Sequence, residues 1–433
     1  MKIPPHLEGL SKRDLIRQNI ILEARVLELE RRLLAYENAH TPPSQQRNYP
    51  KREKNEGAKP GAPSGHQGAT RKTPEPTESK TLSLSSCPDC GNDLGKPKRI
   101  QRKIIEELPD PQPLRVIEFF VPHYHCQNCG REVRAADPEL PKQGNMGNNL
   151  QAQIALMKYE DRIPYRKIAN VLNRQYGLKL TPAAILDVLG RVADSLAPAY
   201  ETIRREIPKS PALNADETGA KLNGKKHWFW VFMSRTLVLF LLRKKRDSNV
   251  VREVIGENYE GVLTCDGLKA YGMIVKKIQR CWAHLLREAK FLAQKHGWQA
   301  GVLYRSLCGL FAEIKKAAAK TPMAIREKLY KNCIKKMRFL ADAAKAHKEL
   351  RKFAATIKNG MGQWFTCVLH PEIEPTNNRA ERELREFVVQ RKIFGTFRSE
   401  KGIKTAGILL SVLATWRLRG FNTYSMLRQV LSS

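Results

Sequence analysis

The chain has 433 residues and a formal net charge of +33 at pH 7, from 76 Lys and Arg against 43 Asp and Glu. A surplus spread over the whole chain favours a polyanionic partner such as double-stranded DNA. No apolar stretch approaches the ~20 residues of a membrane span and no signal region opens the chain, so a membrane protein is excluded.

Cysteine usage indicates a reducing compartment. Four of the nine cysteines form two C-x-x-C pairs, and five are scattered singly. An odd count without a secretion signal is typical of a cytoplasmic protein, and a chain of this charge would be nucleoid-associated.

Residues 11–38 show the heptad spacing of a coiled coil. Ser11 is the expected N-cap, with Asp14 three residues later. One Asn in an apolar seam fixes register and oligomer state, so residues 1–40 are predicted to dimerise, giving a homodimer or higher oligomer. An amphipathic helix packed on its own chain is the alternative. The seam positions are Leu15, Asn19, Leu22, Val26, Leu29 and Leu33.

Residues 41–80 are predicted to be a disordered basic linker. They contain seven Pro, four Gly and eight Lys or Arg, but no Leu, Ile, Val, Met, Phe or Trp. Such a segment cannot bury enough apolar surface to become ordered.

Residues 81–140 carry two matched cysteine pairs, which predict a zinc-binding domain. Each C-x-x-C is followed by a Gly that suits a tight turn, and four thiolates complete a closed structural Zn²⁺ site. β-prone runs at 104–105 and 116–120 complete a zinc-ribbon pattern. His123 and His125 are spare ligands or ordinary strand residues, and a redox dithiol is the rival interpretation. The predicted ligands are Cys87, Cys90, Cys126 and Cys129.

Residues 145–205 have helical periodicity. Pro164 predicts the start of a helix that ends near Gly177, and Thr181–Pro182 predicts the cap and first residue of the next helix. The pair resembles a helix-turn-helix DNA-binding domain with residues 181–192 as the recognition helix. Any two short packed helices give the same pattern.

Residues 210–284 change to strand patterns. Three strands, a helix over 247–255 and further strands follow the order of a ribonuclease H-like sheet, in which sites gather at strand ends. Residues 285–365 predict an all-helical insertion, and 366–420 would complete the catalytic domain. The expected strands cover 213–216, 227–234, 236–242, 262–266 and 277–282.

Three acidic residues stand in settings that suit phosphoryl transfer. Asp216 and Asp266 follow apolar runs, and Glu381 lies in an apparent capped helix start. Their oxygens suit two Mg²⁺ ions, or Mn²⁺, which clamp the attacking and leaving oxygens of a displacement. Glu217 and Glu383 are rivals, and periodicity does not choose between Glu381 and Glu383, because both flank the same buried helix face.

Basic residues are dense after Glu381. Beside an acidic site they would hold a DNA backbone through phosphate contacts, although each one alone also fits a solvated helix face. The predicted DNA-binding residues are Arg382, Arg385, Arg391, Lys392, Arg398 and Lys401.

The order of motifs resembles that of one family. Asp-Glu-Thr-Gly, Cys-Asp-Gly, Cys-Trp-Ala-His and Asn-Asn-Arg-Ala-Glu-Arg follow the coiled-coil, paired-cysteine and helix-turn-helix patterns. This order is similar, over nearly the whole chain, to the TnpC-type DDE transposases of bacterial insertion sequences, the insertion-sequence-sixty-six family. The resemblance implies that Asp216, Asp266 and Glu381 form the catalytic triad. It also implies a multidomain α/β protein whose ribonuclease H-like core carries an all-helical insertion.

The resemblance further implies an Mg²⁺-dependent DNA transposition enzyme. It would bind the terminal inverted repeats of an insertion sequence, cleave DNA and join the 3′-hydroxyl ends to target DNA, which is a DNA recombination reaction. Two small companion proteins of the element are the implied partners. Cys281 and His284 form a C-x-x-H unit that would support the site or position the substrate. A ribonuclease H-like nuclease or resolvase without strand transfer and a catalytically inactive DNA-binding regulator are the alternatives.

Overall fold

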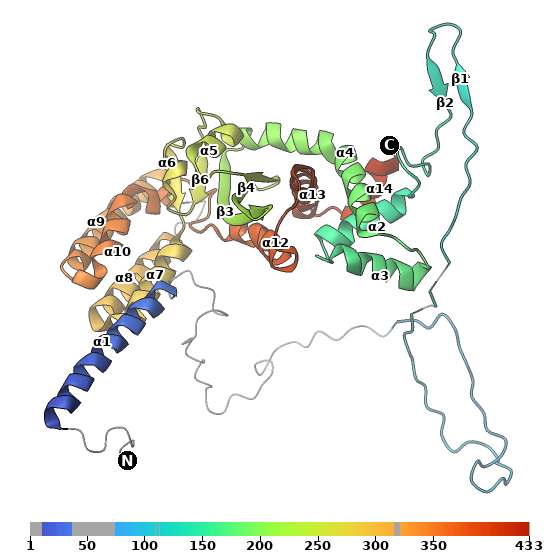
Figure 1. The fold of residues 1–433 in the computed structure, drawn as a ribbon, viewed down its shortest axis with the longest axis horizontal. Helices are drawn as coiled ribbons and strands as arrows, with labels where there is room; N and C mark the ends of the chain where they lie inside the picture. The colour runs from blue at the N-terminus through green and yellow to red at the C-terminus, as the bar shows by residue number, and fades with distance from the viewer. Residues whose placement is uncertain (1–10, 37–73, 109, 112, 316–320, 433) are drawn as a thin grey trace. The chain divides into compact units, whose positions relative to one another are not determined.

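The computed structural model describes residues 11–36, 74–108, 110–111, 113–315 and 321–432, which form a mixed α/β protein (Figure 1). They divide into two compact units, residues 74–114 and residues 11–36 with 115–432. Most of the predicted linker 41–80 lies outside the described residues. No helix in the described part of the chain is long and apolar enough to cross a membrane.

The first described element is α1 (Lys12–Tyr36). Its predicted cap is confirmed, because Ser11 Oγ accepts a hydrogen bond from the Asp14 backbone N–H at 3.3 Å and donates to Asp14 Oδ2 at 2.6 Å. Leu22, Val26 and Leu29 are exposed on the single chain. This leaves apolar seam positions open to solvent, and self-association stays a prediction.

The two cysteine pairs form similar local turns. The Gly91 N–H donates to Cys87 O and the Gly130 N–H donates to Cys126 O, both at 2.8 Å. Both glycines have positive φ, 76° and 66°, which glycine adopts without steric cost. The backbone N–H groups of Cys90 and Asp89 lower the pKa of the Cys87 thiol, and those of Cys129 and Asn128 lower the pKa of the Cys126 thiol. Their joint zinc site stays a prediction.

The strand positions predicted around these turns are wrong. Residues 104–105 and 116–120 form no strand, whereas β1 (His123–His125) pairs antiparallel with β2 (Glu132–Arg134). The β-prone runs remain largely exposed, and β-propensity without a partner strand does not make a ladder. His123 and His125 are strand residues, as one of the two alternatives predicted.

A helical region precedes the sheet. Thr181 Oγ1 accepts the Ala184 N–H at 3.1 Å, which confirms the predicted cap. Gly177 ends the preceding helix with φ 68°, also as predicted. The second helix of this pair continues well beyond residue 192, so the proposed recognition helix is only its first part. The bounds are α2 (Asn148–Tyr159), α3 (Tyr165–Tyr176) and α4 (Pro182–Glu206), with α14 (Thr423–Ser432) packed on α2 and α4.

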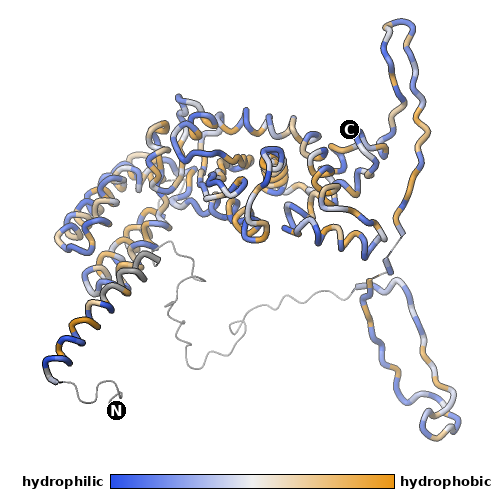
Figure 2. Tube along the Cα trace, in the orientation of Figure 1, coloured by the Kyte–Doolittle hydropathy of each residue, from blue (hydrophilic) through white to orange (hydrophobic). Residues whose placement is uncertain are grey.

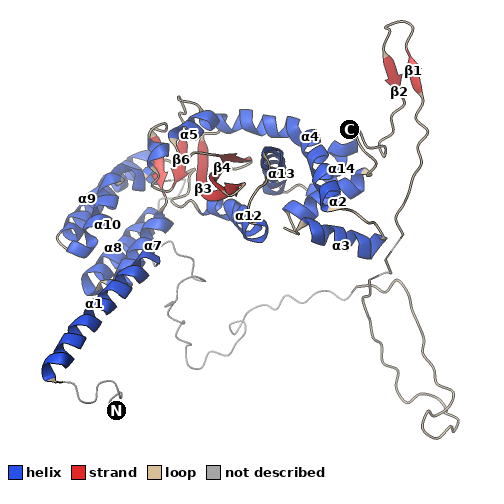
Figure 3. Cartoon of the chain, in the orientation of Figure 1, coloured by secondary structure: helices blue, strands red, loops and turns tan. Residues whose placement is uncertain are grey.

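The larger unit contains a five-stranded mixed sheet in the order β5-β4-β3-β6-β7. Figure 3 shows its strands in red among the helices. β3, β4 and β5 pair antiparallel, whereas β6 is parallel to β3 and β7 is parallel to β6. α5 (Ser248–Ile255) connects β5 to β6, and α6 (Lys269–Gly272) connects β6 to β7. The strands are β3 (Ala212–Leu222), β4 (Lys225–Met233), β5 (Val238–Arg243), β6 (Val262–Cys265) and β7 (Lys277–Arg280).

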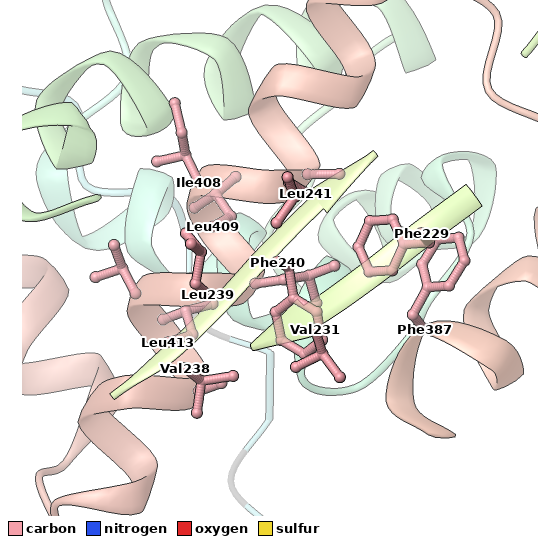
Figure 4. Close-up of a cluster of buried hydrophobic side chains, with 14 of the residues drawn as sticks. Phe229, Val231, Val238, Leu239, Phe240, Leu241, Phe387, Ile408, Leu409 and Leu413 are labelled. Atoms are coloured by element: carbon pink, nitrogen blue, oxygen red, sulfur yellow. The ribbon is translucent and has the colours of Figure 1, made fainter. Parts of the chain in front are cut away.

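Two C-terminal helices cover the antiparallel part of this sheet. In α12 (Asn378–Phe394), Phe387 stacks on Phe229 of β4 with ring centroids 3.7 Å apart (Figure 4). α13 (Glu400–Leu418) packs against β5 and α4. It is apolar around most of its circumference (Figure 2), as expected for a helix enclosed on all sides.

The β5 edge of the sheet is closed by side chains of α13. The Val238 N–H donates to Thr415 Oγ1 at 3.0 Å, and the Phe240 N–H donates to Ser411 Oγ at 2.8 Å. Two backbone donors that would otherwise face an unpaired edge are therefore satisfied by hydroxyls of a helix.

Residues 285–365 are mainly helical, as predicted, and belong to a helical block with its own apolar core around Trp282, Phe353 and Phe365. Helical turns of the 3₁₀ type lie at Ile207–Lys209, Lys348–Leu350 and Met361–Trp364. The helices of the block are α7 (Trp282–Lys295), α8 (Gly297–Lys315), α9 (Met323–Lys345), α10 (Arg351–Asn359) and α11 (Thr366–Leu369).

Candidate metal and phosphate site

Asp216 lies inside β3, and Asp266 directly follows β6. The predicted strand end at Asp216 is wrong, because β3 continues to Leu222 in its pairing with β4. β3 and β6 are parallel, and their register pairs Asn214 with Thr264. Each aspartate follows its paired residue by two positions, so continuing the register places the two carboxylates at neighbouring sites. Both line a cavity of about 470 Å³ at this end of the strands.

Side chains of both charges line this cavity. Acidic groups come from β3, from the turn after β6 and from Glu288 of α7, and guanidinium groups come from three separate segments of the chain. The charged residues that line it include Asp216, Glu217, Asp266, Arg246, Arg280 and Arg287, and Cys281 and His284 lie beside them.

Glu217, one rival of Asp216, has its charge compensated inside the protein. Its enclosed carboxylate accepts hydrogen bonds from Arg246 Nε at 2.8 Å and from the Tyr271 hydroxyl. Arg246 also stacks over Trp228, with its guanidinium carbon 4.7 Å from the ring centroid. Burial and the charge of Asp266 nevertheless raise the pKa of Glu217.

Asp216 has a different environment. Burial raises its pKa well above the ordinary value, and the charges of Glu217, Asp266 and Glu381 raise it further. Its Oδ1 accepts the Glu217 backbone N–H at 2.9 Å, which only partly offsets this cost. Carboxylates that repel one another at the mouth of a cavity fit a divalent cation, because its charge would remove the repulsion.

Glu381 reaches the same region from the first turn of α12. Its Oε1 lies 3.4 Å from His284 Nδ1 and 3.9 Å from Cys281 Sγ, and its Oε2 lies 3.8 Å from Arg287 Nη2. Glu383 lies on the other flank of the helix, where it pairs with Arg417 at 3.2 Å. The structure thus places Glu381, and not Glu383, beside the cavity lining.

Hydrogen bonds hold the starts of α7 and α12 together. The Trp282 N–H donates to Pro375 O at 3.0 Å, and the Asn377 N–H donates to Cys281 Sγ at 3.1 Å. Burial raises the pKa of Cys281. Burial also lowers the pKa of His284, and the charge of Glu381 partly opposes that shift.

Asn377 is a residue that sequence reasoning missed. The expected side-chain cap at this helix start is absent, because the fully buried Asn377 side chain bonds to β3 instead. Its Nδ2 donates to Ala215 O at 2.8 Å, and its Oδ1 accepts from Asn214 Nδ2 at 3.1 Å. Asn377 therefore joins the helix that carries Glu381 to the strand that carries Asp216.

Sequence reasoning also missed Arg280 as a residue of the site. Its Nε donates to Gln363 Oε1 at 2.7 Å, and its guanidinium lies 5.6 Å from the Trp364 ring centroid. A Cβ built on Gly360 would lie 2.7 Å from Arg280 Cδ, so glycine leaves room for this side chain. Its position directly before Cys-Trp-Ala-His was the available sequence signal.

The predicted DNA-binding residues lie on α12, α13 and the turn between them. Arg391 is half-buried and donates to Thr218 Oγ1 at 3.2 Å, and burial lowers its pKa. The interleaved Phe394 and Phe397 pack near Phe387 rather than standing free for stacking. The exposed members of the set are Arg382, Arg385, Lys392, Arg398 and Lys401.

The fold and site define a basic mixed α/β protein with converging carboxylates at one end of its sheet. The sequence pattern of the Transposase IS66 family matches residues 143–405, more than half of the chain, and the chain belongs to this family.

Three uncharacterized proteins of Sinorhizobium fredii (strain NBRC 101917 / NGR234) are also similar. The chain is 25% identical to y4qI over 74% of its length and 66% of that protein. It is 22% identical to y4hP over 80% of its own length and 70% of that protein. It is 23% identical to y4jD over 74% of its own length and 69% of that protein. The aligned regions thus span about two thirds of these relatives.

Proposed function

We propose that this member of a transposase family binds the terminal inverted repeats of an insertion sequence, cleaves DNA and joins the 3′-hydroxyl ends to target DNA. Asp216, Asp266 and Glu381 are the proposed catalytic carboxylates. The observation that carries the proposal is their convergence on one cavity, because Asp216 and Asp266 line it and Glu381 contacts His284, which also lines it. The charges of Asp266 and Glu381 also raise the pKa of Asp216. A hairpin, a parallel strand and a later helix supply the three groups, although they lie far apart in the sequence.

The sheet order supports a ribonuclease H-like core. Three antiparallel strands lead through α5 to two parallel strands on the other side of β3. Catalytic groups at the ends of neighbouring parallel strands are a recurrent arrangement in open α/β sheets. In this proposal α3 and α4 form the helix-turn-helix, and the two cysteine turns share a structural Zn²⁺.

The three carboxylates are the proposed ligands of two Mg²⁺ or Mn²⁺ ions, since hard oxygen donors suit these cations. When bound, the ions would supply Lewis-acid stabilisation of the attacking and leaving oxygens. Arg280 and Arg287 face the same cavity and are placed to bind a phosphate of the DNA strand. Arg246 bonds closely to Glu217 and lies farther, at 3.8 Å, from Asp266 Oδ2, so Asp216 and Asp266 are the proposed metal-binding pair.

The exposed basic side chains of α12 and α13 support binding of double-stranded DNA, both transposon ends and target. Phosphate contacts by Arg and Lys position the duplex without reading sequence, and their strength falls as salt increases. A homodimer or higher oligomer and the two small companion proteins of the element remain the proposed protein partners.

The test is cleavage and joining of labelled terminal-repeat DNA in Mg²⁺. Asp266→Asn and Glu381→Gln should lower both activities by at least about 100-fold, because each removes a charge that stabilises the transition state. DNA binding, measured by fluorescence anisotropy, should persist in both variants.

Glu383→Gln is the matched control, since its carboxylate pairs with Arg417 on the other flank of α12. It should remain active. Cleaved DNA without a joined product would indicate a nuclease or resolvase, and DNA binding without cleavage would indicate a regulator. An active Asp266→Asn would overturn the assignment of the metal ligands.

A further inference from the structure

Three different ligand atoms converge beside the cavity at the starts of α7 and α12. The Cys281 thiol, the His284 imidazole and the Glu381 carboxylate each offer one atom, and these atoms lie within 4.8 Å of one another. Cys281 is buried, and the other two are half-buried. This cluster combines a soft, an intermediate and a hard donor, unlike the purely carboxylate pair formed by Asp216 and Asp266.

The spacing of these atoms fits a tetrahedral metal ion. Zinc bonds of about 2.0 to 2.3 Å place neighbouring ligands about 3.3 to 3.8 Å apart at the corners of a tetrahedron. Glu381 Oε1 lies 3.4 Å from His284 Nδ1 and 3.9 Å from Cys281 Sγ. Octahedral Mg²⁺ with bonds of about 2.1 Å would draw its ligands to about 3.0 Å apart.

Burial and the charge of Glu381 raise the pKa of the Cys281 thiol, but two local features would stabilise anionic ligands once an ion is bound. Cys281 caps the N-terminus of α7, and Glu381 lies in the first turn of α12, so two helix dipoles point positive ends at this cluster. The Asn377 N–H donates to Cys281 Sγ at 3.1 Å, a contact that stabilises a thiolate bound to metal. Arg287 lies nearer the other oxygen of Glu381, Oε2, which leaves Oε1 facing the cysteine and histidine.

We propose that Cys281, His284 and Glu381 form a site for Zn²⁺ or a similar soft divalent ion, separate from the predicted four-cysteine site. A thiolate and a carboxylate balance the charge of the ion, and thiolate with imidazole selects zinc over magnesium. Three protein ligands leave a fourth position open. Cys281 and His284 line the cavity, so this position is accessible to water or to a phosphate oxygen of DNA.

The site has a consequence that rests on the proposed function. Glu381 is also the proposed third ligand of the Mg²⁺ pair, and zinc bound through Oε1 competes for this carboxylate. Micromolar zinc is then expected to inhibit Mg²⁺-dependent cleavage, and a chelator is expected to restore it. The zinc site itself does not depend on any catalytic activity.

The first experiment measures zinc per chain in full-length protein, purified under reducing conditions and equilibrated with Zn²⁺. Cys281→Ser and His284→Ala should each contain one zinc fewer than the wild type, whatever the cysteine turns hold. Cys333→Ser is the matched control, because it removes another buried thiol of the helical block that lies outside the cluster. Zinc content equal to the wild type in both cluster variants would refute the site.

Cobalt substitution gives a second reading that separates ligand loss from misfolding. Replacement of zinc by Co²⁺ should give a thiolate charge-transfer band whose intensity is reduced in Cys281→Ser. Cys281→His should restore the metal content without restoring that intensity, because it supplies a nitrogen ligand instead. Failure of Cys281→His to bind metal while the protein remains folded would also contradict the proposal.

The catalytic variant Asp266→Asn distinguishes this proposal from the proposed function. It should contain as much zinc as the wild type although cleavage is lost. Inactive wild-type protein with the full zinc content would refute the function and leave the site intact. Active wild-type protein, together with unchanged zinc content in the cluster variants, would refute the zinc site and leave the proposed function intact.

Discussion

Asp216 and Glu217 are adjacent residues of β3 whose carboxyl groups have different energetic roles. Glu217 is paired with Arg246 and Tyr271, whereas Asp216 is buried among like charges. The partners of Glu217 offset part of the cost of burying its charge, although its pKa remains raised. A buried acid that repels its neighbours is costly unless a cation binds, which is typical of a functional position.

The first prediction compares amide substitutions of these two residues in metal-free protein. Asp216→Asn should raise the melting temperature by a few degrees, because it removes a group that is buried at an electrostatic cost. Glu217→Gln should raise it by less, because Arg246 and Tyr271 already offset part of the cost of the Glu217 charge. Thermal unfolding followed by circular dichroism measures both shifts, and an equal or larger increase for Glu217→Gln would contradict the contrast.

A second residue-scale prediction concerns pH and Lys158. Lys158 is buried, with Nζ 4.6 Å from the Tyr165 ring centroid, and burial lowers its pKa from 10.5 to about 8. Between these values the unfolded chain holds a proton that the folded chain has released, so stability should rise with pH. The slope for one group is at most about 1.4 kcal/mol per pH unit.

Lys158→Met isolates this contribution. The variant should be more stable than the wild type at pH 7, where the buried charge is still present, and this advantage should shrink as pH rises from about 8 to 10.5. Melting temperatures of both proteins across this range provide the measurement. A difference independent of pH would show that Lys158 has an ordinary pKa.

At the scale of elements, α12 depends on Asn377 for its attachment to β3. Asn377→Ala removes two hydrogen bonds and leaves Ala215 O and Asn214 Nδ2 without this partner. The loss should cost about 1 to 3 kcal/mol of stability. It should also reduce cleavage, since Glu381 starts from the same helix end.

Asn378→Ala is the control, because the neighbouring Asn378 is exposed. Denaturant unfolding and cleavage assays should show near wild-type behaviour for Asn378→Ala and losses in both for Asn377→Ala. Equal behaviour of the two variants would remove the proposed role of Asn377.

At the scale of the whole molecule, self-association is predicted to depend on α1. Leu22, Val26 and Leu29 are exposed on the single chain, and a partner helix would bury them. Deletion of residues 11–36 should shift the oligomer toward monomer without unfolding the sheet. Analytical ultracentrifugation measures the oligomer state of the deletion variant, and circular dichroism checks that it remains folded. Asn19→Leu should change the oligomer state rather than abolish association.

The sequence predicts the sheet better than it predicts the site. Apolar runs locate all five strands, although β3 continues to Leu222, well beyond the predicted end at residue 216. Burial against α12 and α13 follows the apolar pattern of β3, β4 and β5. Runs at 104–105 and 116–120 have similar propensity, yet no partner strand pairs with them. Propensity records local preference, whereas pairing depends on distant segments.

The same distinction explains the missed site residues. The side-chain partners of Arg246, Arg280 and Asn377 come from remote segments, with Arg246 bound to Glu217, Arg280 to Gln363 and Asn377 to Asn214. No local pattern encodes such contacts. Asp266 was accessible because the strand end before it is visible in the sequence. Asp216 was predicted to end a strand but lies inside β3, which continues to Leu222, and the choice of Glu381 over Glu383 came from a family resemblance.

The closure of β5 by α13 has a consequence for synthesis of the chain. Until residues 400–418 leave the ribosome, the strand Val-Leu-Phe-Leu-Leu-Arg presents an open apolar edge to other chains. Premature termination before α13 should therefore yield insoluble protein rather than a soluble fragment. Chains interrupted by a frameshift before residue 400 would thus be removed by aggregation.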